Sequence, residues 1–135
     1  MNNKVDLDFL YISNALKRLK FPSIDLIIGI AEGGVVPASL IAHQLNLPMH
    51  IIRINYRDAD NTPQRKMPEL LQLPPKLPAR SNILLVDDVS VSGQTLSLAK
   101  GFFEGNNVTT LTLKGAADIV LFPQITDCVN WPWKS

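Results

Sequence analysis

The sequence predicts a single α/β domain whose sheet is mainly parallel. Two short runs, "DLIIGIA" at 25–31 and "NILLVDD" at 82–88, are almost continuously apolar and rich in β-branched residues. Such runs are typical of strands that are covered on both faces, as in a parallel sheet. Helical-looking segments alternate with the strands, which favours helical crossover connections. A chain of 135 residues is long enough for one domain of this kind, 1–135.

The first half of the chain alternates between helical and extended patterns. Apolar residues recur with roughly helical spacing over 9–19, which predicts an amphipathic helix before the first strand. A second helix is expected over 37–47, where Pro37 fits the first turn. The run "MHIIRINY" at 49–56 then predicts the second strand.

The second half continues the same alternation after a long interruption. Strand 82–88 is followed by a predicted helix over 95–105, "TLSLAKGFFEG". The run "VTTLTLK" at 108–114 predicts a fourth strand, and "DIVLF" at 118–122 a short fifth one. The result is a twisted, mainly parallel sheet flanked by helices.

The interruption at 57–80 departs from this rhythm. It contains five prolines, and its basic residues are Arg57, Arg65, Lys66, Lys76 and Arg80. Loops of this length inside a compact domain are usually active-site lids or disordered inserts. We interpret it as a flexible lid, with a short helix around Glu69–Gln72 as one option.

Composition restricts the classes of function. The formal net charge of +1 gives no general support for a nucleic-acid partner. No run approaches the roughly 18 apolar residues of a membrane span, and the charged N-terminal segment lacks the apolar stretch of a signal peptide. The single cysteine, Cys128, allows no intrachain disulfide. We therefore expect a cytoplasmic protein without nucleic-acid or membrane partners.

The segment "LLVDDVSVSGQTL" at 84–96 carries the strongest chemical signal. Asp87 and Asp88 end a buried strand, where ligands bind in open α/β sheets. Two carboxylates there suit ribose hydroxyls or a hydrated Mg²⁺. The small residues that follow offer backbone N–H groups at a helix start, which favours a phosphate. Taken singly, an acid pair also occurs in phospho-acceptor domains, and Ser-Gly-x-Thr also forms ordinary turns and N-caps.

The stretch "ILLVDDVSVSGQT" resembles the phosphoribosyl-pyrophosphate (PRPP) motif of the type I phosphoribosyltransferases. This resemblance implies their fold and implies that Asp87 and Asp88 contact the ribose hydroxyls of PRPP and Mg²⁺. It also implies that the 5′-phosphate is held by a loop of six residues, which are Ser90, Val91, Ser92, Gly93, Gln94 and Thr95. Val91 stands where purine-specific members often carry an aspartate, so one general acid/base candidate is missing.

The stretch "IIGIAEGGVVPASLIAHQL" at 27–45 resembles the pyrophosphate loop of the small xanthine/guanine branch of this family. Gly33 and Gly34 would then allow a close approach of the backbone to pyrophosphate. Glu32 stands where that branch usually has arginine, and a carboxylate repels a polyanion. We expect Glu32→Arg to improve the use of PRPP, unless Glu32 points to solvent or helps to hold Mg²⁺.

Other site residues follow from the same resemblance. Arg65 and Lys66 in the lid would meet the leaving pyrophosphate, or else be solvated loop charges. Lys114 would contact the exocyclic oxygen of a purine, or else snorkel at a strand end. The tail 123–135 would bind the base, with Cys128 in the place of a stacking aromatic residue and Val129 presenting its backbone to the base. The two tail tryptophans could equally be core or dimer contacts.

The resemblance implies a PRPP-dependent transfer to xanthine, guanine or hypoxanthine, with Mg²⁺ as cofactor and pyrophosphate as product. Its partners would be PRPP and a nucleobase or nucleotide, in a homo-oligomer that is a dimer or a tetramer. A second hypothesis is a degenerate homologue that binds PRPP or a nucleotide without turnover, since Glu32, Val91 and Cys128 all depart from the family pattern. A third is an unrelated flavodoxin-like or receiver domain.

Overall fold

A computed structural model describes residues 4–55, 69–70 and 77–134, and its centre is a six-stranded sheet. In sheet order the strands are β4 (Glu69–Leu70), β3 (Met49–Asn55), β2 (Leu26–Ala31), β5 (Asn82–Ser90), β6 (Asn107–Gly115) and β7 (Ile119–Val120). The pairs from β3 to β7 are parallel, and only β4 runs antiparallel to its neighbour. The predicted class, a mainly parallel α/β sheet, is confirmed.

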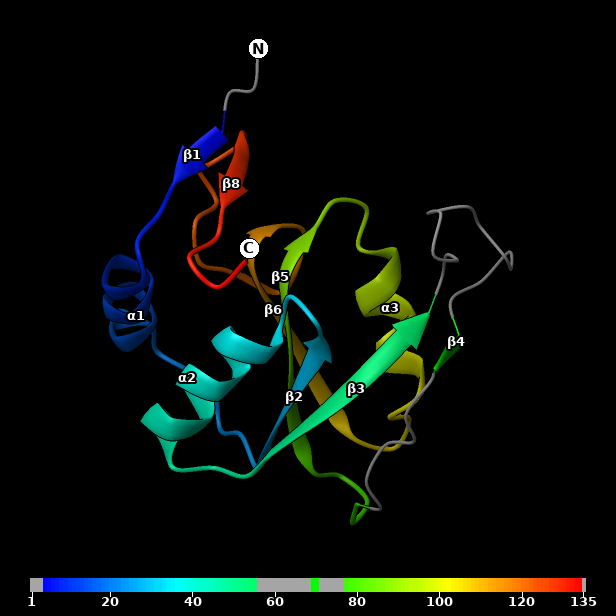
Figure 1. Cartoon of the computed structure of the whole chain (residues 1–135). Helices are drawn as coiled ribbons and strands as arrows, with labels where there is room; N and C mark the ends of the chain where they lie inside the picture. The colour runs from blue at the N-terminus through cyan, green and yellow to red at the C-terminus, as the bar shows by residue number, and fades with distance from the viewer. Residues whose placement is uncertain (1–3, 56–68, 71–76, 135) are drawn as a thin grey trace.

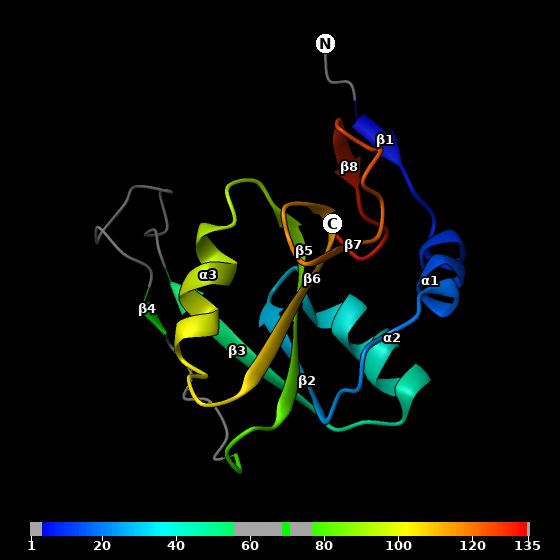
Figure 2. The ribbon, with the colours of Figure 1, turned by 180° about the vertical axis from the view of Figure 1, so that it is seen from behind.

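Helices cover both faces of the sheet (Figures 1 and 2). On one face lie α1 (Phe9–Arg18) and α2 (Val35–Leu45), and on the other lies α3 (Gln94–Gly101). Helix α1 begins at an N-cap, Asp8, whose carboxylate accepts a hydrogen bond of 2.7 Å from the backbone N–H of Tyr11. Such a cap stabilises a helix start by about 1 kcal/mol.

Strand β5 explains why the apolar runs are continuous. Leu84 and Val86 pack against α1 and α2, whereas Ile83 and Leu85 pack on the side of α3. All four side chains are fully buried. Burial of each side chain of this size contributes roughly 1.5–3 kcal/mol to the stability of the fold. The packing on both faces therefore fixes the position of β5 in the sheet. The carboxyl end of β5 is thereby fixed where the acids follow.

A second, two-stranded sheet joins the two ends of the described chain. It consists of β1 (Lys4–Asp6) and β8 (Cys128–Asn130), which run parallel to each other. Beyond β8, Trp131 is buried and stacks on Trp133 with ring centroids 5.6 Å apart. No pattern in the sequence predicted this sheet. It anchors the tail close to the carboxyl end of the main sheet (Figure 1).

Five predicted elements need correction, and two of them are simple shifts of bounds: the helix expected at 37–47 spans Val35–Leu45, and the strand expected at 118–122 spans Ile119–Val120. The helix considered around Glu69–Gln72 is wrong at its start, because Glu69–Leu70 form β4 and pair with the edge of β3. Helix α3 ends at Gly101 and not at 105. At this end the hydrogen bond from Phe102 N–H to Ala99 O tightens the last turn. Strand β5 continues past 88 to Ser90, since its backbone pairs with β6 as far as Gly115.

The described part of the chain contains no helix long and apolar enough to cross a membrane.

Candidate active site

The carboxyl ends of β2, β5 and β6 meet at one edge of the sheet (Figure 1). Strand β2 leads through a diglycine loop, Glu32–Gly34, into α2. Strand β5 carries Asp87 and Asp88 and leads through 91–93 into α3. Strand β6 ends in Lys114 and Gly115, which pair with the end of β5. Segments far apart in the sequence thus form one site.

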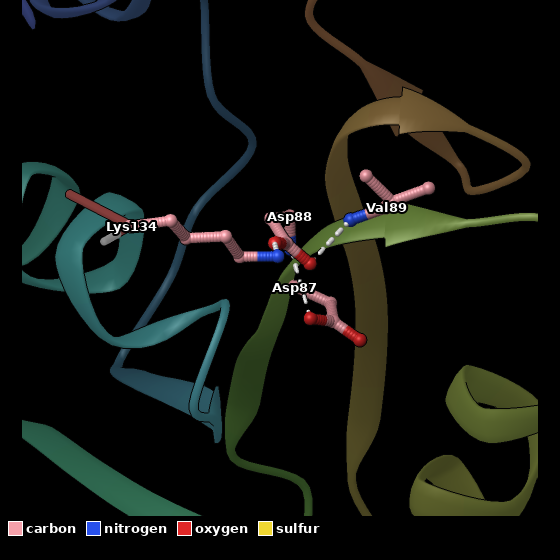
Figure 3. A network of polar contacts seen from close by, with 4 residues as sticks. All are labelled: Asp87, Asp88, Val89 and Lys134. Atoms are coloured by element: carbon pink, nitrogen blue, oxygen red, sulfur yellow. Dashed lines mark hydrogen bonds and ion pairs between the residues drawn. The ribbon is translucent and has the colours of Figure 1, made fainter. Parts of the chain in front are cut away.

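The two acids have different surroundings (Figure 3). Asp88 is buried, and its Oδ1 accepts a hydrogen bond of 2.7 Å from the backbone N–H of Val89. Its Oδ2 forms an ion pair of 3.0 Å with Lys134 Nζ. Asp87 Oδ1 accepts a hydrogen bond of 2.8 Å from the backbone N–H of Asp88. The side chain of Asp88 therefore ties the strand to the tail.

Asp88 also packs against the diglycine loop. A Cβ atom built on Gly33 would overlap the carboxylate of Asp88. A Cβ on Gly34 would overlap the backbone oxygen of Val86 and lie 2.7 Å from that of Ile30. Both glycines are thus required by the contact between the loop and β5, whether or not a ligand is bound.

Asp87 has an unusual acidity. Its burial raises the pKa of its carboxyl group to about 8, and the negative charge of Asp88 acts in the same direction. The backbone N–H of Asp88 and the ammonium group of Lys134 oppose this rise in the pKa of Asp87. At neutral pH the Asp87 carboxyl group is therefore largely protonated in the ligand-free protein.

The loop before α3 has the features of an anion site. Gly93 is the N-cap in the left-handed region, with φ 79°, and makes no side-chain cap. Ser92 Oγ accepts a hydrogen bond of 3.3 Å from the backbone N–H of Gln94, and Val91 is 90% exposed. Ser92 thus meets one N–H group of the helix start, and N–H groups there without a side-chain partner favour a phosphate through hydrogen bonds and the helix dipole.

A cavity of about 310 Å³ lies beside this loop. Its lining residues are Val89, Val91, Lys114, Gly115, Pro123, Ile125 and Thr126. Gly115 has φ 106°, and a Cβ there would overlap the backbone oxygen of Ser90. The cavity joins apolar walls with one ammonium group, which suits a flat heterocycle that carries an exocyclic oxygen.

A model of the phosphoribosyl transferase domain matches residues 11–114, a range that spans the acid pair and both loops. The chain belongs to the phosphoribosyl transferase domain family. The orotate phosphoribosyltransferase of Levilactobacillus brevis is 30% identical over 87 residues, which cover 64% of this chain and 38% of that protein. The chain thus spans about two fifths of the length of the curated relatives it matches.

Solved structures share the whole fold. A purine phosphoribosyltransferase from Pyrococcus horikoshii superposes with a TM-score of 0.79 at 21% identity, over 98% of this chain and 95% of that one. A protein of Neisseria gonorrhoeae whose structure holds bound ppGpp gives 0.74 at 24% identity, over 100% and 91%. These likenesses establish the type I phosphoribosyltransferase fold for this chain.

The phosphoribosyltransferase fold brings most of the predicted site residues to one edge. Lys114 lines the cavity next to the predicted phosphate loop, and its contact with a base stays a prediction. Cys128 is instead exposed on β8, and Val129 packs against the core; neither lines the cavity. Arg65 and Lys66 lie outside the described residues.

Glu32 points largely to solvent, which is one of the alternatives considered from the sequence, but it also has a basic neighbour. Its side chain is 85% exposed, and its Oε1 lies 3.1 Å from Nη1 of Arg53 in β3. The carboxylate is therefore neutralised by a neighbour rather than left facing a ligand alone.

The acid pair fits Mg²⁺ only together with a substrate. No group of three His, Cys, Asp or Glu side chains that could hold a metal occurs among the described residues. Mg²⁺ is, however, often bound by one or two carboxylates plus substrate oxygens. Asp88 Oδ2 already faces a cation, the Lys134 ammonium group, and accepts no hydrogen bond from the described residues. The donor set of Asp87 and Asp88 is thus suitable.

Sequence reasoning expected the tail 123–135 to bind the base but singled out Cys128 and Val129 in it, and it missed Lys134 and the cavity-lining Pro123, Ile125 and Thr126. Their contacts depend on the path of the tail through the fold, which no local sequence pattern predicts.

We expect Lys134→Met to lower the free energy of unfolding by roughly 1–2 kcal/mol. The buried Asp88 carboxylate loses its cation, while the half-exposed position of the lysine limits the effect. Chemical denaturation measures it, with Lys17→Met on α1 as the control. A loss no larger than that of the control would contradict this role.

A second expectation concerns the phosphate loop. Gly93→Val should weaken binding of a 5′-phosphate at least about tenfold, since a β-branched residue resists positive φ and shifts the loop. The fold should survive, because a Cβ at Gly93 meets no atom within 4 Å. Gly93→Asn, which tolerates this conformation better, is the control. Calorimetry with ribose 5-phosphate gives the affinities, and an unchanged value for Gly93→Val would remove phosphate binding from this loop.

Proposed function

We propose that this domain transfers the 5-phosphoribosyl group of PRPP to a 6-oxopurine, namely xanthine, guanine or hypoxanthine, and releases pyrophosphate. The observation that carries the proposal is the shared edge on which the acid pair, the glycine-capped start of α3 and the Lys114 cavity lie. In a nucleotide the 5′-phosphate, the ribose and the base are joined in one molecule, so a phosphate site, an acid pair for the ribose and a base cavity must lie side by side.

The residues of the chain would act mainly by positioning and by charge. In this proposal residues 90–95 hold the 5′-phosphate, and the two acids contact the ribose hydroxyls, with Asp87 and Asp88 also available to Mg²⁺. Lys114 donates to the exocyclic oxygen of the base between the apolar walls of the cavity. Bound Mg²⁺ would offset the charge of the leaving pyrophosphate. An oxocarbenium-like transition state needs such placement more than a covalent nucleophile.

The cavity affects the choice of base. Among the residues that the structure describes, those that line the cavity include no carboxylate to take a proton from the attacking nitrogen. Bases that lose this proton readily in water should therefore react best, which favours xanthine among the purines. Orotate belongs in the same test, because curated relatives of part of the chain are orotate phosphoribosyltransferases.

The test is a panel of purines and pyrimidines with PRPP and Mg²⁺, in which pyrophosphate release is measured. We expect turnover with an oxo base and none with adenine. Release that needs no base, or no release with any base, would contradict transfer.

Lys114 gives a sharper form of the same test. Lys114→Met should lower kcat/KM for the preferred base by about 10–100-fold, since a charged hydrogen bond of roughly 1.5–3 kcal/mol is lost. The KM for PRPP should stay within about twofold, an estimate that treats the two subsites as independent. Equal losses for the base and for PRPP would point to a structural role for Lys114.

An alternative is a nucleotide-binding protein without turnover. It is favoured by the position of Cys128 outside the cavity and by the fold shared with a protein that holds ppGpp. Nucleotide binding by calorimetry without pyrophosphate release in the panel would support it. In either case we propose a cytoplasmic homo-oligomer, a dimer or a tetramer, which light scattering would test.

A further inference from the structure

Arg53 lies next to the diglycine loop. In the parallel register of β2 and β3 it pairs with Ala31, the residue immediately before Glu32. Its Nη1 atom is 3.1 Å from Glu32 Oε1, and its side chain is 52% exposed. A guanidinium group therefore stands beside the loop although the loop itself contains no basic residue.

We propose that Arg53 binds the diphosphate of PRPP, and that Glu32 positions its guanidinium group for this. The inference rests on the proposed function, because it requires a diphosphate at Glu32–Gly34. Arg53 would be a binding residue and Glu32 a positioning residue.

The diglycine loop needs a basic side chain such as Arg53 because some of its own backbone N–H groups already donate hydrogen bonds. The backbone N–H of Gly34 donates to Ile30 O at 2.8 Å, and that of Val35 donates to Glu32 O at 3.1 Å. Neither of these amides is free for a ligand at the start of α2. A diphosphate carries several negative charges, so side-chain donors are needed in addition to the remaining amides.

Arg53 still has donors to offer. A guanidinium group carries five N–H donors in a planar fork, and the bond to Glu32 uses Nη1. The same fork matches two phosphate oxygens at once. A carboxylate that holds one side of the fork reduces the rotamer freedom that binding would otherwise remove.

The other described cations at this edge have different partners. Lys134 pairs with buried Asp88, and Lys114 lines the cavity for the base. The pair between Arg53 and Glu32 is solvent-exposed on both sides, and such pairs add little to stability. Variants of this pair should therefore fold, and their effects on binding can be measured directly.

The experiment is calorimetric titration of pyrophosphate and, separately, of ribose 5-phosphate into the full chain. Arg53→Gln should weaken pyrophosphate binding at least about tenfold, while ribose 5-phosphate binding stays within about twofold of the wild type, an estimate for separate subsites. Arg18→Gln, the same charge change on α1, should alter neither. Unchanged pyrophosphate affinity in Arg53→Gln would overturn the inference alone.

A charge swap tests the part of Glu32. Glu32→Arg combined with Arg53→Glu rebuilds the pair with the guanidinium group on the loop, and pyrophosphate affinity should lie within about threefold of wild type, since a paired guanidinium fork is still present beside the loop. A swap as weak as Arg53→Gln would remove Glu32 from the proposal. A wild-type protein that binds neither ligand would overturn the proposed function, and this inference with it.

Discussion

Replacing Gly34 with alanine is expected to destabilise the domain by more than about 3 kcal/mol, a large part of the roughly 5–15 kcal/mol of a typical domain. The added Cβ would overlap the backbone oxygen of Val86 in β5 and lie 2.7 and 2.9 Å from backbone atoms of Ile30 in β2. Backbone atoms of two central strands cannot move aside without breaking the sheet. Denaturant unfolding gives the change in free energy.

Gly101→Ala is the matched control. Gly101 is the last residue of α3, and a Cβ there meets nothing within 4 Å. This change should stabilise the protein by up to about 1 kcal/mol, because alanine favours the helix over glycine. A loss for Gly34→Ala as small as the change at Gly101 would mean that the loop can withdraw from β5.

The glycine pair illustrates what sequence alone could supply. The two adjacent glycines predicted a tight loop, and we interpreted them as allowing the backbone to approach pyrophosphate closely. The structure adds that Gly34 is required by the strands and Gly33 by the carboxylate of Asp88. Val86 and Asp88 lie more than fifty positions along the chain from the glycines that they contact, so no local pattern contains these two contacts.

The main strands were predictable because burial on two faces leaves a continuous apolar run, and the first helix because its apolar residues recur at helical spacing. The elements that were missed are short: β1 and β8 have three residues each, too few for any periodicity, and depend on pairing with each other. The end of α3 was misjudged because Phe103 looks like a helical core residue, yet it is buried from a turn after the helix.

The site was predictable where its chemistry lies within one segment. The acid pair and the phosphate loop are contiguous, so a single stretch identified them. The partners of the charges were not, because Lys134 reaches Asp88 from the tail and Arg53 reaches Glu32 from another strand. Charge pairs between distant segments depend on the fold and have no signature in the sequence.

Replacing Asp87 with asparagine should remove at least about 99% of the transferase activity while making the protein more stable at pH 8, as expected for a charged group kept for function. The activity falls because a carboxylate that would meet ribose and Mg²⁺ is lost. Asparagine Oδ1 can still accept the hydrogen bond from the backbone N–H of Asp88, so the strand should keep its shape.

The sign of the stability change follows from proton binding. Burial raises the pKa of Asp87 from 3.8 to about 8 on folding, so the folded state keeps a proton that the unfolded state releases between these values. The wild type should therefore lose stability as pH rises from about 4 to 8, by roughly 1–3 kcal/mol between pH 5 and 8 after allowance for coupling to Asp88. Asp87→Asn has no proton to lose at this position, so its loss of stability over that pH range should be smaller by the same amount.

Asp25→Asn, at the other end of β2, is the control. It keeps an oxygen for the 2.8 Å bond from Asn82 N–H and should retain both the activity and the wild-type slope of stability against pH. Unfolding curves are measured at pH 5 and pH 8, with pyrophosphate release measured on the same samples. Equal slopes for wild type and Asp87→Asn would show that the Asp87 carboxyl group does not govern the pH dependence, and retained activity would remove Asp87 from the site.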